Sequence, residues 1–563
     1  MLVILVGYWL LAIAHGARPI ARTEYGPVEG IEMETYGRRK IYGFFNIPYT
    51  EDVNSRRRFE ELKDPAPWYD VFDAGGPPKD CPYVTISNDL TGVENCLGIN
   101  IFSPLPPNPP YSARLYPVVV YIHGGAYYFY SGGDFGPRYL LDKDVVLVTI
   151  NFRIGIPGFG STGDYILPGN LGLKDQVKAL KWIQRNIRNF GGDKNLVTLV
   201  GMSSGASCVH LHYISPQSRG LFHRGFMSGG AATEFWSMSP APLRTLELVA
   251  KNLKCPTDTP FDIVVCLERV PARELAMSVR TVQVGIVPIA PFAPVLDEFS
   301  RDPFLTEYPY EALRAGHAAN LPLVVSDVLT GGIFPGAPIV EDEDAMRLID
   351  QNWNYAGDLL LGLKDNILDV YLNDTLRLIR QFYFGDSPIN RFVENPFIKM
   401  ISDRYFLANA MKAVALQARH NPQVYFYLFD YKGGQSTAQA LSQTPNKYNA
   451  SHIDDMLYFF NATQVRSLEQ NSTDLRMIDR MTTMLANFAR TGVPYFGGNV
   501  DFRPVSQQTS IFGPINLLRI RSPDDMKMEE FKNLGNIKFW ESLPFLSPRK
   551  TTYYRSNMKE KFP

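Results

Sequence analysis

Two long segments of this chain are almost continuously apolar, which indicates strands buried on both faces of a sheet. They are Tyr116–His123 and Val145–Asn151. A strand with one wet face would alternate apolar and polar residues instead. Further strands are predicted at Cys96–Phe102, Leu196–Val200, Arg224–Gly229, Leu321–Val325 and Val424–Phe429.

Between these strands, apolar residues recur at helical spacing. One such stretch is Leu171–Phe190, and residues 236–420 are predicted to be largely helical. Strand, helix and strand in alternation predict an α/β fold with a large, mostly parallel, doubly wound sheet. Tyr25–Gly30 and Arg39–Pro48 have the pattern of short strands joined by turns, so we expect an antiparallel edge at the N-terminus.

The composition is that of a globular protein, and it gives no sign of a boundary between separate domains. A length of 563 residues can hold about three or four average domains, but large α/β enzymes reach this size as one domain. We see no linker or repeat, and therefore expect one domain over residues 17–546, followed by a short basic extension, 547–563. The 56 basic and 57 acidic residues give a net charge of -1, which excludes the electrostatic footprint of a nucleic-acid-binding protein.

The N-terminus predicts export. Residues 1–16 form an apolar run that is short for a bilayer span and ends in the small-residue site Ala14-His15-Gly16, as in a secretory signal peptide. No later stretch approaches transmembrane length, so we expect a secreted, extracellular protein with no membrane span. Four glycosylation sequons agree with export: Asn373, Asn449, Asn461 and Asn471.

The chain has five cysteines, and an exported protein can pair four of them. Local spacing suggests Cys81 with Cys96 and Cys255 with Cys266, each closing a short loop, although the sequence alone leaves the connectivity open. Cys208 is left over, and we expect a small buried thiol there.

The stretch Val197–Ala206 carries the chemical motif around which the chain is organised. An apolar, β-branched run there breaks into Gly-x-Ser-x-Gly and leads into a helix-like segment, which is the context of a nucleophile elbow. A sharp strand-to-helix turn would expose the hydroxyl of Ser203, and Gly201 and Gly205 would allow the strained backbone. Ser203 is therefore the candidate nucleophile.

Several other motifs occur in order along the chain. Together with the elbow they resemble the type B carboxylesterase and cholinesterase family, from about Tyr25 to Pro544. The resemblance implies the α/β-hydrolase fold, ester hydrolysis without a cofactor or metal, the two cysteine pairs above, and structural ion pairs of Arg58 with Glu94 and of Arg153 with Asp175. The motifs are Glu94–Asn100, His123–Tyr127, Asn151–Gly155, Gly169–Gln176, Phe190–Asp193 and Ser451–Asp455.

The same resemblance assigns the partners of the nucleophile. Gly124 and Gly125, at the end of a predicted strand, would form an oxyanion hole with the Ser204 N–H. A serine hydroxyl needs a base to take its proton. Of the eight histidines, His452 lies far downstream in the family order of serine, acid and histidine, so we predict that it is the general base.

The acid of the triad is missing from its expected position. In the family a carboxylate follows the strand that corresponds to Leu321–Val325, in the form Glu-Gly-x-Tyr-Pro, and here the segment Thr330–Pro335 puts Gly331 at that position. Asp327 is four residues upstream, roughly 13 Å along an extended chain, and does not reach. Asp454, Asp455, Glu298 or another carboxylate remain open as replacements. The second residue of the elbow, usually acidic in this family, is Met202.

The substrate side of the sequence is less specific. The aromatic run Tyr127–Tyr130 either lines the mouth of a pocket for a small hydrophobic ester or packs in the core. The segment Tyr83–Asn95 has no tryptophan, so the cation–π platform of a choline esterase is absent and acetylcholine is not an expected substrate. A glycan on Asn449 would obstruct substrate entry, unless that loop is buried and the sequon unused.

Two hypotheses follow from these residues. The first is a secreted carboxylesterase that hydrolyses esters through a Ser203 acyl-enzyme, with His452 as base and an impaired rate because of Gly331. The second is a catalytically silent member that binds a protein partner or acts in adhesion outside the cell, as some members of the family do. The first has the nucleophile, the base and the oxyanion hole in its favour, and the second has Gly331 and Met202.

Overall fold

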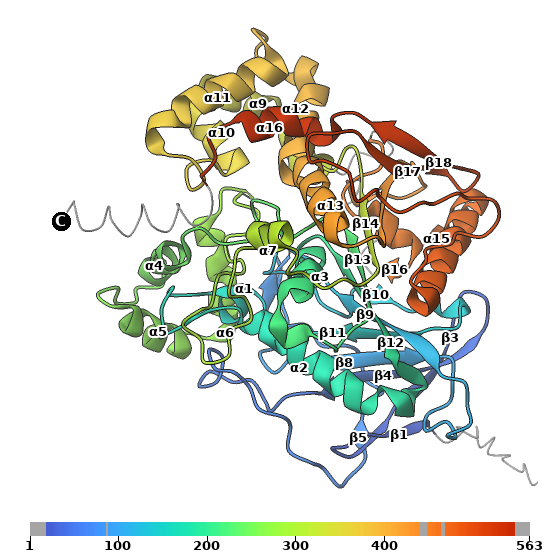
Figure 1. The fold of residues 1–563 in the computed structure, drawn as a ribbon. Helices are drawn as coiled ribbons and strands as arrows, with labels where there is room; N and C mark the ends of the chain where they lie inside the picture. Colours follow the sequence, from blue (N-terminus) through green and yellow to red (C-terminus); the bar gives the residue numbers. More distant parts are fainter. Residues whose placement is uncertain (1–17, 86–87, 286, 439–447, 463–467, 547–563) are drawn as a thin grey trace, which may run out of the picture.

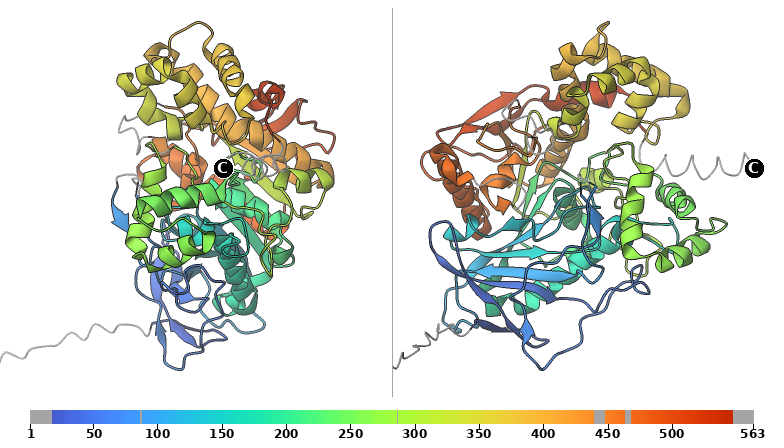
Figure 2. Two further views of the ribbon diagram at one scale, coloured as in Figure 1. Left: turned by 90° about the vertical axis from the view of Figure 1, so that its left-hand side faces the viewer. Right: turned by 180° about the vertical axis from the view of Figure 1, so that it is seen from behind.

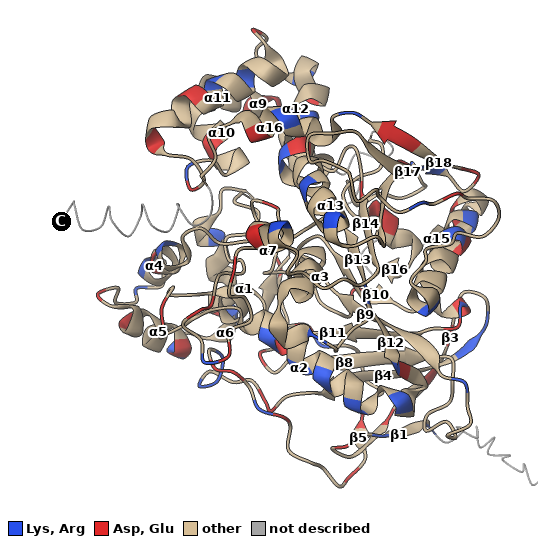
Figure 3. Ribbon diagram, in the orientation of Figure 1, with Lys and Arg blue, Asp and Glu red and all other residues tan. Residues whose placement is uncertain are grey.

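The computed structural model describes residues 18–85, 88–285, 287–438, 448–462 and 468–546. The predicted signal peptide and the basic extension lie outside these ranges and stay predictions. Within the described part of the chain, no helix is both long enough and apolar enough to cross a bilayer. Acidic and basic residues lie interspersed along the helices (Figure 3), as the near-zero net charge suggests.

One eleven-stranded sheet runs through the molecule (Figure 1). The pairs from β11 through β9, β12, β13, β14 and β15 to β17 are parallel, and the pairs outside them are antiparallel. In spatial order the strands are β18 (Asp525–Phe531), β17 (Ile515–Ser522), β15 (Val424–Phe429), β14 (Leu323–Asp327), β13 (Arg224–Ser228), β12 (Gly192–Met202), β9 (Tyr116–Ile122), β11 (Val146–Ile150), β8 (Gly98–Ser103), β4 (Lys40–Pro48) and β3 (Ile31–Glu34).

Both faces of the central sheet are covered, which is why its strands are apolar throughout. In β9, Val118 and Val120 belong to one core and Val119 and Tyr121 to another, because successive side chains point to opposite faces. The first core is filled from helices α2 (Leu171–Asn186) and α3 (Ser204–Ile214), and the second from α15 (Ser472–Thr491), which lies across the sheet from them (Figure 2). The predicted doubly wound α/β sheet is confirmed.

The predicted strands and the N-terminal antiparallel edge are present, and the C-terminal hairpin β17–β18 was not predicted. Only Met526 of β18 is buried and the other residues are partly or fully exposed, so this edge lacks the continuous apolar signal of the centre. Shorter strands are β1 (Ile20–Arg22), β2 (Pro27–Glu29), β5 (Phe72–Asp73), β6 (Tyr83–Val84), β7 (Leu90–Thr91), β10 (Phe135–Gly136) and β16 (Asn461–Ala462).

The region 236–420 is largely helical, as predicted, apart from β14 and its loops. Figure 1 shows two groups of helices beyond the sheet, α4–α6 at the left and α9–α12 at the top. The remaining helices are α1 (Gly155–Phe159), α4 (Pro242–Asn252), α5 (Pro260–Arg269), α6 (Ala272–Met277), α7 (Pro309–Ala315), α8 (Ile333–Val340), α9 (Glu343–Gln351), α10 (Trp353–Leu361), α11 (Asp369–Phe384), α12 (Glu394–Ser402), α13 (Ala408–His420) and α16 (Ile537–Ser542).

Both predicted disulfides are formed, Cys81–Cys96 with an S–S distance of 2.04 Å and Cys255–Cys266 with 2.09 Å. The fifth cysteine, Cys208, is a buried free thiol in α3. Disulfides of this kind fit the oxidising compartment that the sequence predicts.

The two predicted ion pairs are also formed. Arg153 binds both carboxylate oxygens of Asp175, at 2.7 Å from Nε and from Nη2. Arg58 binds Glu94 through Nε and Nη2, each at 2.7 Å. Arg58, Arg153 and Asp175 are buried, so both pairs hold the scaffold together, as the family resemblance implies.

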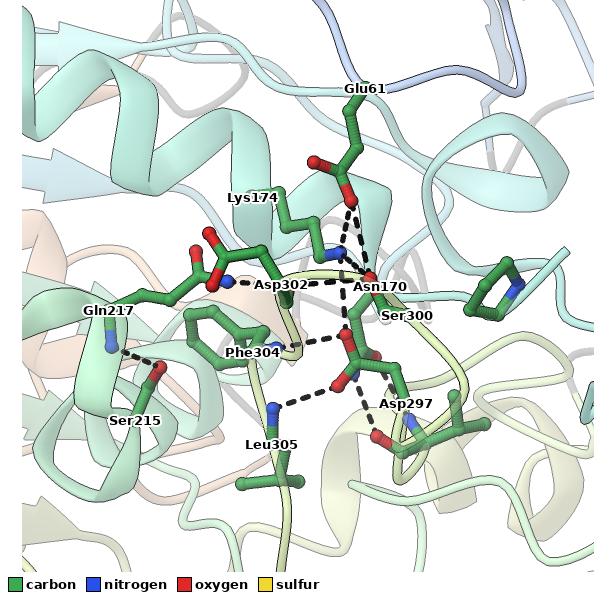
Figure 4. A network of polar contacts seen from close by, with 12 residues as sticks. Glu61, Asn170, Lys174, Ser215, Gln217, Asp297, Ser300, Asp302, Phe304 and Leu305 are labelled. Atoms are coloured by element: carbon green, nitrogen blue, oxygen red, sulfur yellow. Dashed lines mark hydrogen bonds and ion pairs between the residues drawn. The ribbon is translucent and has the colours of Figure 1, made fainter. Parts of the chain in front are cut away.

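Helix α2 is also tied to two surface loops through Lys174 (Figure 4). Its ammonium group donates to Ser300 Oγ at 2.6 Å, forms an ion pair with Glu61, and lies 3.6 Å from Asp297 Oδ2. The Lys174 side chain is 9% exposed and that of Asp297 is fully buried. The lysine therefore supplies the nearby positive charge for a buried carboxylate.

Asp297 in turn organises its own loop (Figure 4). Its carboxylate accepts hydrogen bonds from Phe304 N at 2.9 Å, Leu305 N at 2.8 Å and Asn170 Nδ2 at 2.9 Å. Burial nevertheless raises the pKa of Asp297, although these bonds and Lys174 act in the opposite direction. The charged carboxylate thus depends on every one of its partners.

We expect Lys174→Met to lower the free energy of unfolding by about 1–3 kcal/mol at neutral pH, because it leaves Asp297 buried without its cation. The folded state binds a proton at Asp297 more readily than the unfolded state does, so the loss shrinks as pH falls through the raised pKa. Urea unfolding of wild type and variant at neutral and mildly acidic pH measures this.

Lys181→Met is the matched control, because Lys181 lies on the same helix with an exposed side chain. It should change stability little. Equal losses for the two variants, or a Lys174→Met loss that grows toward acid pH, would contradict the role given to this network.

Candidate active site

Ser203 sits between the end of β12 and the first turn of α3, on a backbone that few residues adopt. Its φ is 54° and its ψ is -124°. A Cβ on Gly201 would lie 2.2 Å from Gly205 O, and one on Gly205 would lie 2.2 Å from Ile122 O. The turn therefore closes only because both flanking residues are glycine, which is the geometry expected of the Gly-x-Ser-x-Gly motif.

Neighbouring strands hold this turn in place and leave the hydroxyl open. Ser203 N donates to Ser228 O at 2.7 Å, which joins the elbow to the end of β13. The Ser203 side chain is partly exposed, and its Oγ has no hydrogen-bond partner among the described residues. The hydroxyl is thus available to a base or a substrate.

The glycine pair after β9 packs directly against the elbow. A Cβ on Gly124 would lie 2.7 Å from Met202 O and 3.1 Å from Ser203 Cβ, and Gly125 has a φ of 90° that favours glycine. In the part of the chain that the structure describes, the N–H groups of Gly124, Gly125 and Ser204 have no hydrogen-bond acceptor. Three unused donors beside Ser203 are what an oxyanion hole requires.

His452 approaches the elbow from the other side. Its ring is 1% exposed and packs over Gly229, where an added Cβ would lie 2.7 Å from both Cε1 and Nδ1. A Cβ on the next residue, Gly230, would lie 2.3 Å from Ser203 O. Consecutive glycines after β13 therefore contact the predicted base and the predicted nucleophile, which brings these two distant residues into one region.

The surroundings of His452 are apolar. Its ring stacks on Phe406, with centroids 4.3 Å apart and planes at 25°, and Phe334 lies 5.3 Å away. Neither ring nitrogen has a hydrogen-bond partner among the described residues. Burial alone lowers the pKa of His452 to about 3, with no carboxylate acting against it. The imidazole is therefore neutral at physiological pH.

Phe406 also fills the space next to Gly331. A Cβ on Gly331 would lie 2.8 Å from Phe406 Cδ2 and 3.4 Å from Val328 Cγ2. The ring that blocks the first atom of a side chain at position 331 is the ring that stacks on His452. An apolar ring thus stands between the expected acid position and the histidine. Phe406 was not predicted from the sequence, where no spacing relates it to either residue.

The two aspartates that follow His452 are bound elsewhere. Asp455 accepts hydrogen bonds at 2.7 Å each from Ser228 Oγ, Ser326 Oγ and Tyr427 OH. Asp454 accepts from Ser451 N at 2.7 Å and from N and Oγ1 of Thr437 at 2.7 and 2.8 Å.

Glu298 and Asp327, the other two carboxylates considered, do not act as the acid behind His452 either. Glu298 has an exposed side chain, away from the buried ring of His452. Asp327 Oδ1 accepts from Val328 N at 2.8 Å, and burial raises the pKa of this carboxyl to about 8. None of the four carboxylates named from the sequence forms a hydrogen bond to His452 in the described part of the chain.

Met202 and the first residue of the aromatic run 127–130 are part of the core. Met202 is fully buried at the end of β12. In the run 127–130 the first ring, Tyr127, is 1% exposed and packs on Phe159 and Trp236 at centroid distances of 4.9 and 6.4 Å. The core interpretation of this ring therefore holds.

The sequons differ in accessibility. Asn449 and Asn373 are exposed. Asn471 is the N-cap of α15, where its Oδ1 accepts from Thr473 N at 2.9 Å, and Asn461 Oδ1 accepts from Arg138 N at 2.8 Å. Asn373, Asn449 and Asn471 are thus exposed, and Asn461 is partly exposed.

Three comparisons with known proteins agree on one family. A family model described as the carboxylesterase family matches residues 17–540. Esterase FE4 of Myzus persicae is 36% identical over 516 residues, 90% of this chain and 90% of that protein. Neuroligin-2 of Homo sapiens is 27% identical over 590 residues, 96% of this chain and 66% of that protein.

Among solved structures, juvenile hormone esterase from Manduca sexta, with OTFP covalently attached, matches with a TM-score of 0.82. The match is 25% identical and covers 93% of this chain and 99% of that one. The sheet described above is accordingly that of an α/β-hydrolase fold.

We expect the imidazole of His452 to stay neutral from about pH 8 to about pH 5, because its pKa lies near 3. The Cε1–H signal of ¹³C-labelled histidine, assigned with His452→Gln, should not move over that range. Phe406→Ala admits water beside the ring and should raise this pKa by about one unit or more. Phe392→Ala, at a ring that is 81% exposed, is the control. A wild-type signal that titrates near pH 6 would contradict the buried, unpartnered ring.

Proposed function

The chain belongs to the carboxylesterase family, and from that premise we propose that it hydrolyses carboxylic esters at a strongly reduced rate. The supporting observation is the constellation at the elbow: Ser203 on a strained turn, three unused N–H donors beside it, and His452 in the same region. These groups are sufficient for acyl transfer in principle, whereas a purely structural turn does not need unused donors.

In the proposed reaction, Ser203 Oγ attacks the carbonyl carbon of the ester while His452 takes the hydroxyl proton. The N–H groups of Gly124, Gly125 and Ser204 hold the oxyanion of the tetrahedral intermediate. His452 then gives its proton to the leaving alcohol, and water repeats the cycle on the acyl-enzyme. Each proton thus passes through one imidazole, so the rate depends on how readily that ring becomes positively charged.

That dependence predicts a slow enzyme. Loss of the triad acid lowers turnover by roughly 10⁴-fold, because the imidazole loses its anchor and the charge that stabilises imidazolium. Here the neighbour of His452 is the Phe406 ring, which offers neither. A neutral, apolar environment that holds the pKa of His452 at about 3 makes the ring a weak base.

We further propose a small hydrophobic ester as the substrate and an extracellular site of action for the domain of residues 17–546. The two disulfides and the exposed Asn449 support export. Asn449 is three residues before His452, so a glycan there would restrict access of bulky substrates. The missing tryptophan in Tyr83–Asn95 argues against a choline ester.

A second candidate function is binding without turnover, to a protein partner outside the cell. A specific observation favours it: Phe406 fills the acid position and Gly331 leaves room for the ring, so the two residues fit each other as a pair. The resemblance to Neuroligin-2 over nearly the whole chain supports a non-hydrolytic role, because silent adhesion members exist in this family.

Labelling with a fluorophosphonate probe separates the two functions. Under the first, deglycosylated wild type reacts slowly at Ser203 and Ser203→Ala does not react. Gly331→Glu alone should gain nothing, because its side chain meets Phe406 at once. The double variant Gly331→Glu/Phe406→Ala provides a carboxylate and the room for it, and should accelerate labelling by up to about 10⁴-fold.

Phe406→Ala alone is the matched control, since it opens the space without adding an acid. Labelling of wild type that Ser203→Ala abolishes supports the hydrolase. Wild type that never reacts, while the double variant does, supports the silent member. Fast labelling of wild type, at the rate of a complete triad, would overturn the impaired site itself.

A further inference from the structure

A cavity of about 420 Å³ lies outside the Ser203 region, and it contains a buried arginine that forms no ion pair with any described residue. Its walls come from the segment after β13, from α13 and from α16 (Figure 1). Arg404, in the π-helical turn η6 (Asp403–Leu407), lines it and is 6% exposed. Such wide turns occur frequently at functional sites. Neither Ser203 nor His452 lines this cavity.

The guanidinium of Arg404 is held by aromatic rings. Its Cζ lies 4.2 Å from the ring centroid of Phe235, 4.6 Å from that of Phe545 and 5.5 Å from that of Trp540. Nε donates to Leu361 O at 3.1 Å. Within the described residues, Nη1 and Nη2 have no acceptor, and Nη2 is fully buried. Buried arginines are normally paired, so these unused donors point to a ligand.

The charges around the cavity select the sign of that ligand. The second cation, Lys412, is already paired with Glu541. Glu234 is 3% exposed, and burial raises its pKa well above the usual range, with Asp327 adding to the effect, although Asn409, Lys412 and Arg404 oppose it. Burial therefore favours the protonated form of Glu234 more than that of an exposed glutamate. Arg404 is therefore the cation of this cavity that forms no ion pair among the described residues, which suits an anionic ligand.

An adjoining cavity has room for an apolar chain attached to that anion. A space of about 270 Å³ shares Phe235, Met238 and Pro240 with the first. Apolar walls come from Leu248, Val282, Ile289, Pro291 and Leu359. Charged residues also line this lobe, namely Arg244, Asp358, Lys364 and Asp365, and Arg244 is ion-paired with Asp365 at 3.4 Å. The two volumes together match the size of sites that bury a small amphipathic molecule.

We propose that this two-lobed cavity binds an amphipathic monocarboxylate, with its carboxylate on Arg404 and its apolar chain in the second lobe. The planar guanidinium offers two parallel N–H donors that fit both carboxylate oxygens, and the three rings fix its plane. In its protonated form, the Glu234 carboxyl can donate a further hydrogen bond to the anion. The site is independent of ester hydrolysis at Ser203.

Calorimetric titration of the full chain with decanoate and with decylammonium tests the proposal. Wild type should bind decanoate at least about tenfold more tightly than decylammonium. Arg404→Met keeps the length of the side chain in its aromatic cage and should weaken decanoate binding about tenfold or more. Arg347→Met, at an arginine that is 65% exposed on α9, should leave it unchanged. Equal affinity of wild type and Arg404→Met, or equal binding of both ions, would overturn the site.

Two further variants keep the test decisive. Met238→Trp fills the junction of the two lobes without changing a charge, so it should also weaken decanoate binding. It serves as the test if Arg404→Met does not fold. Full affinity for decanoate in Met238→Trp would count against the proposal. Ser203→Ala should bind decanoate as wild type does. Loss of binding in Ser203→Ala would place decanoate in the esterase site and overturn the separate cavity.

Discussion

The turn from β12 into α3 leaves no room for a side chain at Gly201 or Gly205, and the neighbouring segments of the molecule pack closely against it. Gly201 touches Gly205, Gly205 touches the end of β9, and Gly124 touches the backbone of Met202. These contacts bring α3 against the sheet and place the N–H groups of the β9 loop beside Ser203. The central strands themselves are apolar on both faces because helices cover the sheet on both sides. The position of the nucleophile is thus a property of the whole sheet.

Next to this turn, the environment of His452 differs from that of the histidine in a complete catalytic triad. A carboxylate behind an imidazole stabilises a positive charge, whereas a stacked aromatic ring in a dry environment stabilises the neutral form. Phe406 does the latter, and it is sterically compatible with glycine at position 331. Chemistry that needs imidazolium is therefore disfavoured, while packing and the oxyanion donors are intact. An enzyme of low turnover and a binding protein are both consistent with this balance.

Most of the buried ionisable side chains discussed above have several hydrogen-bond or ion-pair partners, and Arg404 is an exception. Arg153 with Asp175 and Asp455 with its three hydroxyl donors are fully paired, and they hold strands and loops together. Arg404 is buried to a similar degree and has one hydrogen bond to a backbone carbonyl among the described residues. Uncompensated groups of this kind are costly and persist mainly where something binds. The turn η6 carries both exceptional residues, Arg404 toward the cavity and Phe406 toward His452.

The sequence by itself determined the central strands, because burial on both faces leaves a continuous apolar run, and it determined the elbow by its motif. Spacing only suggested the two disulfides, and the family resemblance implied both them and the replacement of the acid by Gly331. The sequence did not reveal the β17–β18 hairpin, whose largely exposed edge strand carries a weaker signal than the core. Nor could it tell where the carboxylates of Asp454 and Asp455 point. Only the tertiary structure decided that Phe406, 75 positions after Gly331, fills the place of the acid, and that Arg404 is buried without an ion pair among the described residues. Contacts between residues so far apart leave no local pattern, since they arise when separate helices pack on one sheet.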